Sequence, residues 1–144
     1  MQFADCARSR KMVRAFQKKS VDAELLNRIV EIASWAPSAG KAQGWHLLVL
    51  QNEDTNRFWN VTLPEEKRAS FRWQHLLDAP VIALAFADPN AYLERYSEPD
   101  KASTKLGSSL ENWPTPYWTV DASFATMQLL LAAHDVGLGA LFFG

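Results

Sequence analysis

The sequence has a single cysteine, Cys6, among its 144 residues, and this excludes an internal disulfide framework. A lone thiol fits a reducing compartment, so we expect a cytoplasmic protein. No apolar run approaches the roughly 20 residues needed to span a bilayer, and the first residues lack the basic start of a secretory signal. The net charge of −1 provides no excess of cations, so we expect neither nucleic acid nor a membrane as a partner.

Several catalytic and cofactor motifs are also absent. The sequence contains no Gly-x-Ser-x-Gly elbow, Walker loop or Gly-x-Gly-x-x-Gly fingerprint. The three histidines have no spacing that is typical of a metal site, so no metal is expected. Gly137-Leu138-Gly139 follows a predicted helix instead of preceding one, which is the wrong order for dinucleotide binding. The sequence therefore indicates no general acid, base or nucleophile, and the catalytic residues are unknown at this stage.

Hydrophobic periodicity predicts helices separated by short apolar strands, within one domain that covers residues 1–144. Apolar stripes predict helices over residues 22–36 and 121–136, with shorter helices over 2–9, 54–62 and 65–77. Apolar runs predict buried strands at 46–50, 81–87 and 139–143. Ser20 or Asp22 can cap the start of the helix over 22–36, and Gly137 can end the helix over 121–136 in a left-handed turn. This pattern is typical of an α+β fold with a sheet flanked by helices.

Two parts of the chain do not fit this regular pattern. Residues 88–118 contain four prolines and a polar stretch, and we predict that they form a lid or an interface arm. The predicted strand 139–143 stops at the last residue, whereas a strand end usually leads to a polar surface. We therefore expect either that the chain is truncated or that a partner supplies the missing sheet edge.

The segment Arg10-Lys11-Met12-Val13-Arg14-Ala15-Phe16 is rich in cations, and Arg8 precedes it. Arg10 and Arg14 lie four residues apart and can converge on one anion, and guanidinium groups bind phosphate in a bidentate way. The alternative is a pair of solvated surface arginines.

A second segment, Ala36-Pro37-Ser38-Ala39-Gly40-Lys41-Ala42-Gln43-Gly44-Trp45, precedes the first predicted strand. Gly40 permits a positive φ angle, and the small residues let a planar ligand approach the backbone. The alternative is an ordinary connection between a helix and a strand. Together the two segments are typical of the two ends of a flavin mononucleotide (FMN) site. Six tryptophans either pack in a core or dimer interface or form walls around a planar ligand.

With these residues the sequence resembles the FMN-dependent nitroreductases. The matching motifs are the two segments above together with Leu76-Leu77-Asp78-Ala79-Pro80 and the run from Leu129 to Ala140. The resemblance implies a nitroreductase-like α+β fold with a mixed or antiparallel central sheet, in a homodimer that binds FMN at the subunit interface. It also implies an oxidoreductase that passes hydride from NAD(P)H through FMN to a nitroaromatic, a quinone or a similar small-molecule electron acceptor.

The resemblance further implies a set of cofactor-binding residues: Arg10, Lys11, Met12, Arg14, Pro37, Ser38, Ala39, Lys41, Gln43, Arg72, Leu141, Phe142, Phe143 and Gly144. Arg10 and Arg14 would hold the phosphate, residues 37–39 would reach the flavin of the other subunit, and Phe143 or Gly144 would bring an N–H near flavin N5. Met12 stands where the family has serine, Lys41 where it has asparagine, and Gly44 where it has proline. Lys41 would place a cation near the ring and favour the reduced anionic flavin.

Family members continue for several dozen residues beyond the position of Gly144, and that tail adds an exchanged strand and basic phosphate contacts. An alternative function is therefore a non-catalytic or weakly FMN-binding dimerisation or regulatory domain of the same fold. A third alternative is reductive dehalogenation or flavin breakdown, for which residues 88–118 offer no assignable lid residue. Candidates for the substrate side, with packing as the other interpretation, are Trp113, Tyr117, Trp118 and Phe124.

Overall fold

The computed structural model describes residues 1–144, which form two compact units. The first unit comprises Met1–Val30, Leu48–Leu84 and Leu130–Gly144, and the second comprises Glu31–Leu47 and Ala85–Leu129. No helix of the chain has both the length and the apolar character required to cross a membrane. The organisation of residues 1–144 as one domain stays a prediction.

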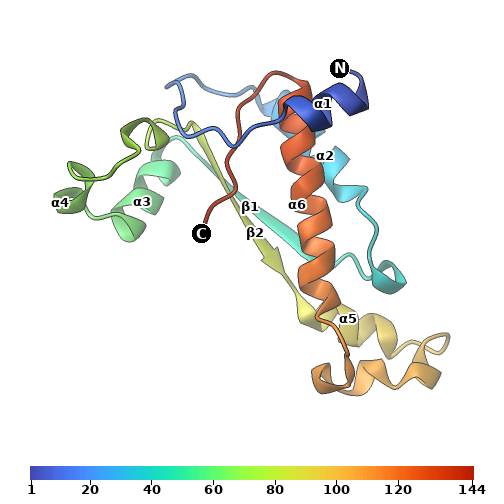
Figure 1. Ribbon diagram of the computed structural model, residues 1–144. Coiled ribbons are helices and arrows are strands. Elements are labelled where there is room, and N and C mark those ends of the chain that lie inside the picture. The colour runs from blue at the N-terminus through green and yellow to red at the C-terminus, as the bar shows by residue number, and fades with distance from the viewer. The chain divides into compact units, whose positions relative to one another are not determined.

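The sheet consists of two antiparallel strands, β1 (Trp45–Gln51) and β2 (Val81–Ala87), which lie side by side (Figure 1). Helices together with this small sheet confirm the α+β class. The predicted third strand over 139–143 is wrong, because the segment makes only an isolated parallel bridge between Ala140 and Met12. The N–H of Val13 donates to the carbonyl of Ala140 at 3.0 Å, but the N–H of Phe142 then faces the sulfur of Met12 at 3.5 Å. A thioether replaces the next backbone acceptor, so the ladder does not continue.

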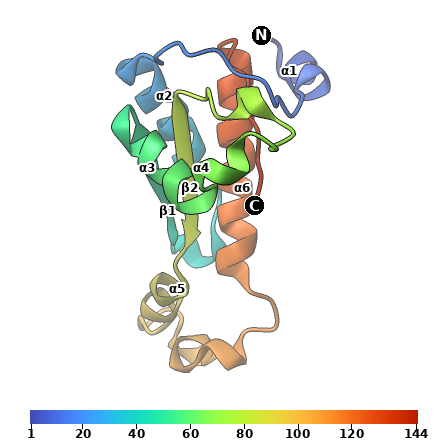
Figure 2. The same cartoon turned by 90° about the vertical axis from the view of Figure 1, so that its left-hand side faces the viewer.

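In the first unit, helix α1 (Phe3–Ser9) confirms the helix predicted over 2–9, and α3 (Glu53–Thr62) confirms the one over 54–62. The helix predicted over 65–77 is wrong beyond α4 (Glu65–Arg68), and only a 3₁₀ turn, Gln74–Leu76, follows. The side-chain amide of Gln74 donates to the carbonyls of Arg68 and Phe71 at 2.6 and 2.7 Å, which satisfies acceptors that a continuing helix would need. Arg68 also donates to Asn60 at 2.7 Å, and this bond ties α4 to α3 (Figures 1 and 2).

The core of the first unit is centred on Trp59, Leu76 and Ile82, all buried. Partly buried apolar side chains pack around them: Phe16, Leu50, Phe58, Leu63, Phe71, Leu77, Leu84 and Leu141. The ring of Phe143 stacks on Trp59 with centroids 6.2 Å apart and planes 12° apart. Burying each such side chain contributes about 1.5–3 kcal/mol, so this core holds the segment that follows Gly139 in place.

Local residues explain where the two long helices begin and where the second of them ends. Helix α2 (Ala23–Ser34) is capped by Asp22, whose carboxylate accepts the N–H of Leu25 at 2.9 Å. Helix α6 (Tyr117–Asp135) begins four residues before the predicted start at 121, since the carbonyl of Pro116 already accepts the N–H of Thr119 at 2.9 Å. It ends at Asp135, and the φ of 82° at Gly137 confirms the predicted left-handed turn after it.

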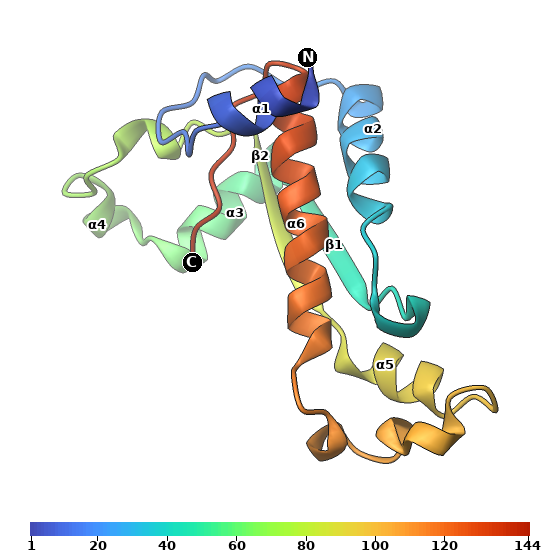
Figure 3. The ribbon, with the colours of Figure 1, turned by 45° about the vertical axis from the view of Figure 1, so that its right-hand side comes forward.

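In the second unit, helix α5 (Pro89–Tyr96) leads into three 3₁₀ turns, Ala102–Thr104, Leu106–Ser108 and Leu110–Asn112 (Figure 3). Asp88 caps α5 by accepting the N–H of Asn90 at 2.9 Å. Tyr92, which is fully buried, meets Trp113 edge to face at 5.7 Å between ring centroids. Residues 88–118 therefore contribute aromatic side chains to the core of this unit. Of the two roles considered for Trp113, substrate contact and packing, the structure shows packing. Their role as a lid or interface arm stays a prediction.

Candidate functional site

The arginine segment begins at the end of α1, where the N–H of Arg10 donates to the carbonyl of Cys6 at 3.0 Å. Two nitrogens of the Arg10 guanidinium, Nε and Nη1, are buried and have no hydrogen-bond partner. A buried charge without a partner carries a large desolvation cost, which an anion placed beside it would offset. The donor set of Arg10 therefore fits a phosphate group.

The guanidinium groups of Arg14 and Arg72 both contact the ring of Trp73. The guanidinium carbon of Arg14 lies 5.4 Å from the ring centroid of Trp73, and that of Arg72 lies 4.5 Å from it. Both distances are within the range of cation–π attraction. Trp73 was missed by the sequence reasoning, because nothing in the residues around it indicates that two arginines would share its ring.

The last residues of the chain lie beside the arginine segment. Besides the bridge between Met12 and Ala140, Gly139 packs so closely on Val13 that a Cβ at this position would lie 3.0 Å from its Cγ2. Phe142 and Phe143 are both exposed by about half or more of their surface. The structure thus groups residues 10–14, Arg72 and residues 141–144 in the first unit.

The second group of predicted residues forms the loop between α2 and β1, where Ala39–Lys41 makes a 3₁₀ turn. Gly40 has the predicted positive φ, at 61°. Lys41 and Gln43 also have positive φ angles, of 58° and 52°, and this conformation costs about 1–3 kcal/mol for a residue with a side chain. The hydroxyl of Ser38 accepts the N–H of Gln43 at 2.9 Å across the turn. Pro37, Ser38, Ala39, Lys41 and Gln43 all lie in the second unit.

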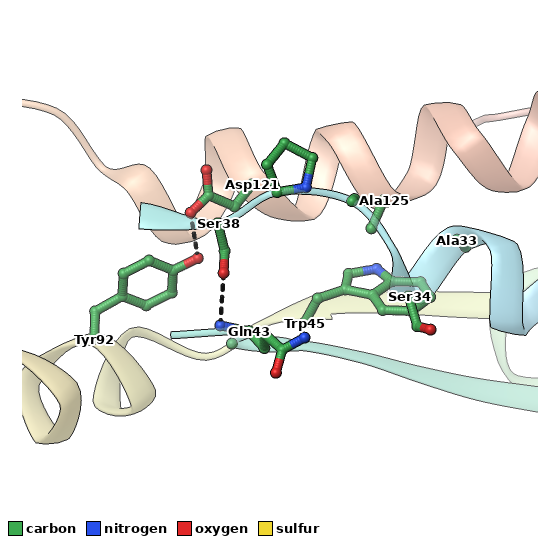
Figure 4. Close-up of a pocket in the computed structure, with 11 residues that line it drawn as sticks. Ala33, Ser34, Ser38, Gln43, Trp45, Tyr92, Asp121 and Ala125 are labelled. Atoms are coloured by element: carbon green, nitrogen blue, oxygen red, sulfur yellow. Dashed lines mark hydrogen bonds between the residues drawn. The ribbon is translucent and has the colours of Figure 1, made fainter. Parts of the chain in front are cut away.

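Side chains from later in the chain hold this loop, and the sequence reasoning missed them. One carboxylate oxygen of Asp121 accepts the N–H of Ala39 at 2.8 Å. The same oxygen accepts the hydroxyl of Tyr92 at 2.6 Å (Figure 4). Nε of Arg95 donates to the carbonyl of Gly40 at 2.7 Å. Burial and then the hydrogen bond to Asp121 raise the pKa of Tyr92, which keeps its hydroxyl protonated as the donor. Asp121 is an acidic residue among the apolar residues of α6, and this was the signal in the sequence that could have identified it as a support of the loop.

A cavity of about 100 Å³ lies behind the loop, between the end of α2, the start of β1 and α6 (Figure 4). Its walls include Pro37, Ser38, Gln43, Tyr92 and Asp121. Sites for drug-sized ligands occupy about 300–1,000 Å³. This cavity is too small for a three-ring flavin, so a flavin in contact with the loop would have to lie on its outer side.

The close approach of neighbouring residues in the second unit explains why position 44 is a glycine. A Cβ at this position would lie 2.7 Å from the carbonyl oxygen of Asp88 and 2.7 Å from the ring of Tyr92. The N–H of Asp88 also donates to the Gly44 carbonyl at 2.8 Å. The start of α5 therefore packs directly on this backbone, and a proline here would collide with it.

The chain matches known proteins over nearly its whole length. The nitroreductase family model matches residues 7–144. A Methanothermobacter thermautotrophicus protein, provisionally named NADH dehydrogenase/NAD(P)H nitroreductase, is 29% identical over all of this chain, which spans 61% of that protein's length. An iodotyrosine deiodinase from Thermotoga neapolitana is 32% identical over 95% of this chain and 70% of the deiodinase.

Solved structures share the same arrangement of elements. A nitroreductase-like protein from Streptococcus mutans superposes with a TM-score of 0.72 at 21% identity, covering 94% of this chain and 71% of that one. A Desulfovibrio desulfuricans protein, provisionally named a nitroreductase and solved in complex with FMN, gives a TM-score of 0.65 at 25% identity over 100% of this chain and 69% of that one. These likenesses confirm the predicted nitroreductase-like fold.

Proposed function

Because this chain belongs to the nitroreductase family, we propose that it is an FMN-dependent oxidoreductase that uses NAD(P)H to reduce a nitroaromatic, a quinone or a similar electrophile. The single observation that carries the proposal is that two nitrogens of the half-buried Arg10, Nε and Nη1, are buried without an acceptor. FMN, when bound, supplies the electron chemistry, and the protein supplies position and electrostatics. The relatives named for NAD(P)H nitroreductase activity and FMN binding support this assignment.

Arg10 and Arg14 would bind the phosphate of FMN. Guanidinium groups suit this role because they stay charged and present paired donors to phosphate oxygens. Arg14 is additionally oriented by the ring of Trp73 and by a 3.4 Å contact from its Nη1 to the carbonyl of Met12. Lys11 is exposed next to Arg10 and adds to the positive field without a defined contact.

The loop of residues 37–43 would face the isoalloxazine ring through its backbone, the hydroxyl of Ser38 and the ammonium of Lys41. Lys41 lies in an exposed turn, and its charge would stabilise negative charge that develops on a ring bound beside it. The backbone of residues 141–144 would pass the redox-active edge of the ring. The family resemblance supports both roles.

We further propose a homodimer with FMN at the subunit interface. Tyr117, Phe124 and Met127 lie on one face of α6 and are each exposed by 39–48%. Large apolar side chains gathered on one face are typical of an interaction surface. Sedimentation equilibrium checks this proposal: a dimer is expected for the wild type, and a shift towards monomer for Phe124→Asp. A monomeric wild type in the presence of FMN would contradict it.

The 32% identity to an iodotyrosine deiodinase favours a second candidate, in which a halogenated phenol accepts two electrons and a proton, and the products are the dehalogenated phenol and a halide ion. The same cofactor site serves both candidates. The choice lies in the residues that face the substrate.

The proposed function is tested by titrating the purified protein with FMN and following its visible spectrum and fluorescence. We expect saturable binding, bleaching of the flavin by NADH or NADPH, and recovery of colour when a nitroaromatic or a quinone is added. Recovery with iodotyrosine alone would favour the second candidate. A protein that binds FMN but is not reoxidised by any of these acceptors would be a non-catalytic domain, and one that does not bind FMN would contradict the proposal.

A further inference from the structure

We propose that Asp121 is a positioning residue that holds the loop of residues 38–43 in the conformation that receives the flavin, with Arg95 holding the other side of the same turn. Neither residue would touch the cofactor. This inference rests on the proposed function, since the loop matters chemically only where it meets a bound ligand. It adds two residues, neither of which belongs to the motifs that suggested the FMN site.

Asp121 meets the loop at a single, well-defined atom. Its side chain is buried, with the residue 6% exposed, and one oxygen accepts both the N–H of Ala39 at 2.8 Å and the hydroxyl of Tyr92 at 2.6 Å. Hydrogen bonds to a charged acceptor are about twice as strong as those between neutral groups. A carboxylate that is buried without a cation is costly to desolvate, and the hydrogen bonds from Ala39 and Tyr92 offset part of that cost. Figure 4 shows Asp121 and Tyr92 meeting beside Ser38.

Arg95 fixes the same turn one residue further along. Its Nε donates to the carbonyl of Gly40 at 2.7 Å, while Nη1 and Nη2 bind the carboxylate of Asp100 at 2.8 and 2.9 Å. The bidentate pair with Asp100 leaves the guanidinium little freedom to turn away from Gly40. Tyr96 of the same helix covers Gly40 so closely that a Cβ there would lie 2.7 Å from its ring (Figure 3 shows the turn beside α5).

The loop needs these supports because its backbone is strained. Gly40, Lys41 and Gln43 all have positive φ angles, and two of them carry side chains that disfavour this region. Strained backbone persists only where surrounding contacts determine it. The bonds to Ala39 and Gly40 bracket the start of the strained stretch, so they fix the direction in which Ser38 and Lys41 are presented.

The first experiment uses the protein without flavin and measures amide hydrogen exchange at Ala39 in the wild type, Asp121→Ala and Asp121→Asn. We expect Asp121→Ala to speed exchange at Ala39 by about tenfold, the factor that corresponds to one lost hydrogen bond to a charged group. Asp121→Asn keeps an acceptor oxygen but loses its charge, so exchange at Ala39 should lie between that of the wild type and that of Asp121→Ala. Ile82→Val, a small truncation in the core of the first unit, is the control that lowers stability without touching the loop.

The second experiment measures FMN affinity in the same variants. Asp121→Ala should weaken FMN binding by about tenfold, with substantial recovery in Asp121→Asn, whereas Ile82→Val should bind FMN as the wild type does. If Asp121→Ala does not fold, Arg95→Met replaces it, with faster exchange expected at the amides of Lys41 and Ala42.

The outcomes separate this inference from the proposed function. Unchanged exchange at Ala39 in Asp121→Ala overturns the positioning role, whatever the protein binds. Equal losses of FMN affinity in Asp121→Ala and Ile82→Val also overturn it, because the effect would then follow from stability alone. A wild type that does not bind FMN, but whose Ala39 amide is protected by Asp121, overturns the proposed function and leaves the support of the loop in place.

Discussion

The guanidinium of Arg10 has two buried nitrogens without an acceptor, an arrangement that becomes stable when an anion binds beside it. Replacing Arg10 with methionine should weaken FMN binding by about 1.5–3 kcal/mol, the value of a charge-assisted hydrogen bond. The apoprotein should melt no earlier than the wild type, because an uncompensated cation has been removed. Fluorescence titration with FMN and thermal unfolding without it measure the two effects.

The matched control for Arg10 is Arg57→Met on α3. Arg57 is exposed and paired with Asp54 at 3.0 Å, so its loss should change neither FMN affinity nor the stabilisation that FMN provides. If Arg10→Met bound FMN as tightly as the wild type, Arg10 would not be the phosphate ligand.

Lys41 allows a prediction about the electronics of the bound flavin. Its ammonium is exposed in the turn, and removing it as Lys41→Met should lower the flavin reduction potential, since the reduced form carries more negative charge. A loss of about 1.4 kcal/mol corresponds to about 30 mV for a two-electron couple. Potentiometric titration of the FMN complex measures this shift, and Lys67→Met on α4 is the control with an equal loss of charge. An unchanged potential in Lys41→Met would place the cation away from the ring.

At the scale of elements, the loop between α2 and β1 and the turn after α6 each contain a glycine with positive φ, but their surroundings differ. Gly40 faces the ring of Tyr96, whereas no atom lies within 4 Å of the position of a Cβ at Gly137. Gly137→Ala should therefore lower the free energy of unfolding by only about 1 kcal/mol, the cost of placing alanine at a positive φ angle. Gly40→Ala should cost more, because Tyr96 must also move away from Trp113, its partner at 4.7 Å between centroids.

Urea unfolding of the two alanine variants checks this comparison. Since both substitutions place alanine at a left-handed φ angle, the difference between their free energies of unfolding reports mainly the contact with Tyr96. If both variants lost the same free energy of unfolding, Tyr96 would adapt freely to the added methyl group. The close packing of α5 on the loop would then contribute little to stability.

The regular elements could be predicted from the sequence because their signals are local. The stripe of α2, the cap at Asp22 and the turn at Gly137 each depend on residues a few positions apart. Helix α5 was missed, although Asp88 followed by Pro89 is a typical helix start. The predicted third strand was wrong because the side chain of Met12 meets Phe142, a contact between residues 130 positions apart.

In the candidate site, too, the residues in local motifs could be predicted from the sequence and the long-range contacts could not. Residues 10–14 and 37–43 could be proposed from short motifs, and the positive φ of Gly40 followed from its residue type. The supports of the loop could not, since Ala39 and Asp121 are 82 positions apart and Gly40 and Arg95 are 55 apart. Only the folded chain shows that a carboxylate on α6 and a guanidinium on α5 meet the same turn.

At the scale of the whole molecule, Asp78 links folding stability to pH. The hydrogen bond from His75 at 2.9 Å, followed by the interaction with Lys18 at 3.4 Å, lowers the pKa of Asp78 below its usual 3.8 despite the opposing effect of burial. A lowered folded-state pKa contributes stability that is complete above the unfolded-state pKa and is lost as the pH falls through the folded-state value. Asp78→Asn should therefore destabilise the protein at pH 6, by about 1 kcal/mol for a partly exposed pair.

Urea unfolding of the wild type and Asp78→Asn across pH 2–7 measures this linkage (about the range over which carboxylates titrate). The two free energies of unfolding should converge at the acid end, where Asp78 is protonated in both states. Asp54→Asn, whose partner Arg57 is exposed, serves as the control with a smaller effect. A constant difference at every pH would assign the cost to packing.

The first unit is assembled from three separated stretches, and the last of them is residues 130–144. Leu141 packs against the buried cluster of Trp59, Leu76 and Ile82, so this core is complete only once residues 130–144 have been synthesised. Contacts between such distant residues slow folding, because a long loop must close before any gain follows. At about 5–20 residues per second on the ribosome, several seconds separate the synthesis of Leu84 from that of Leu141, and during this interval the core around Trp59 lacks one of its apolar partners.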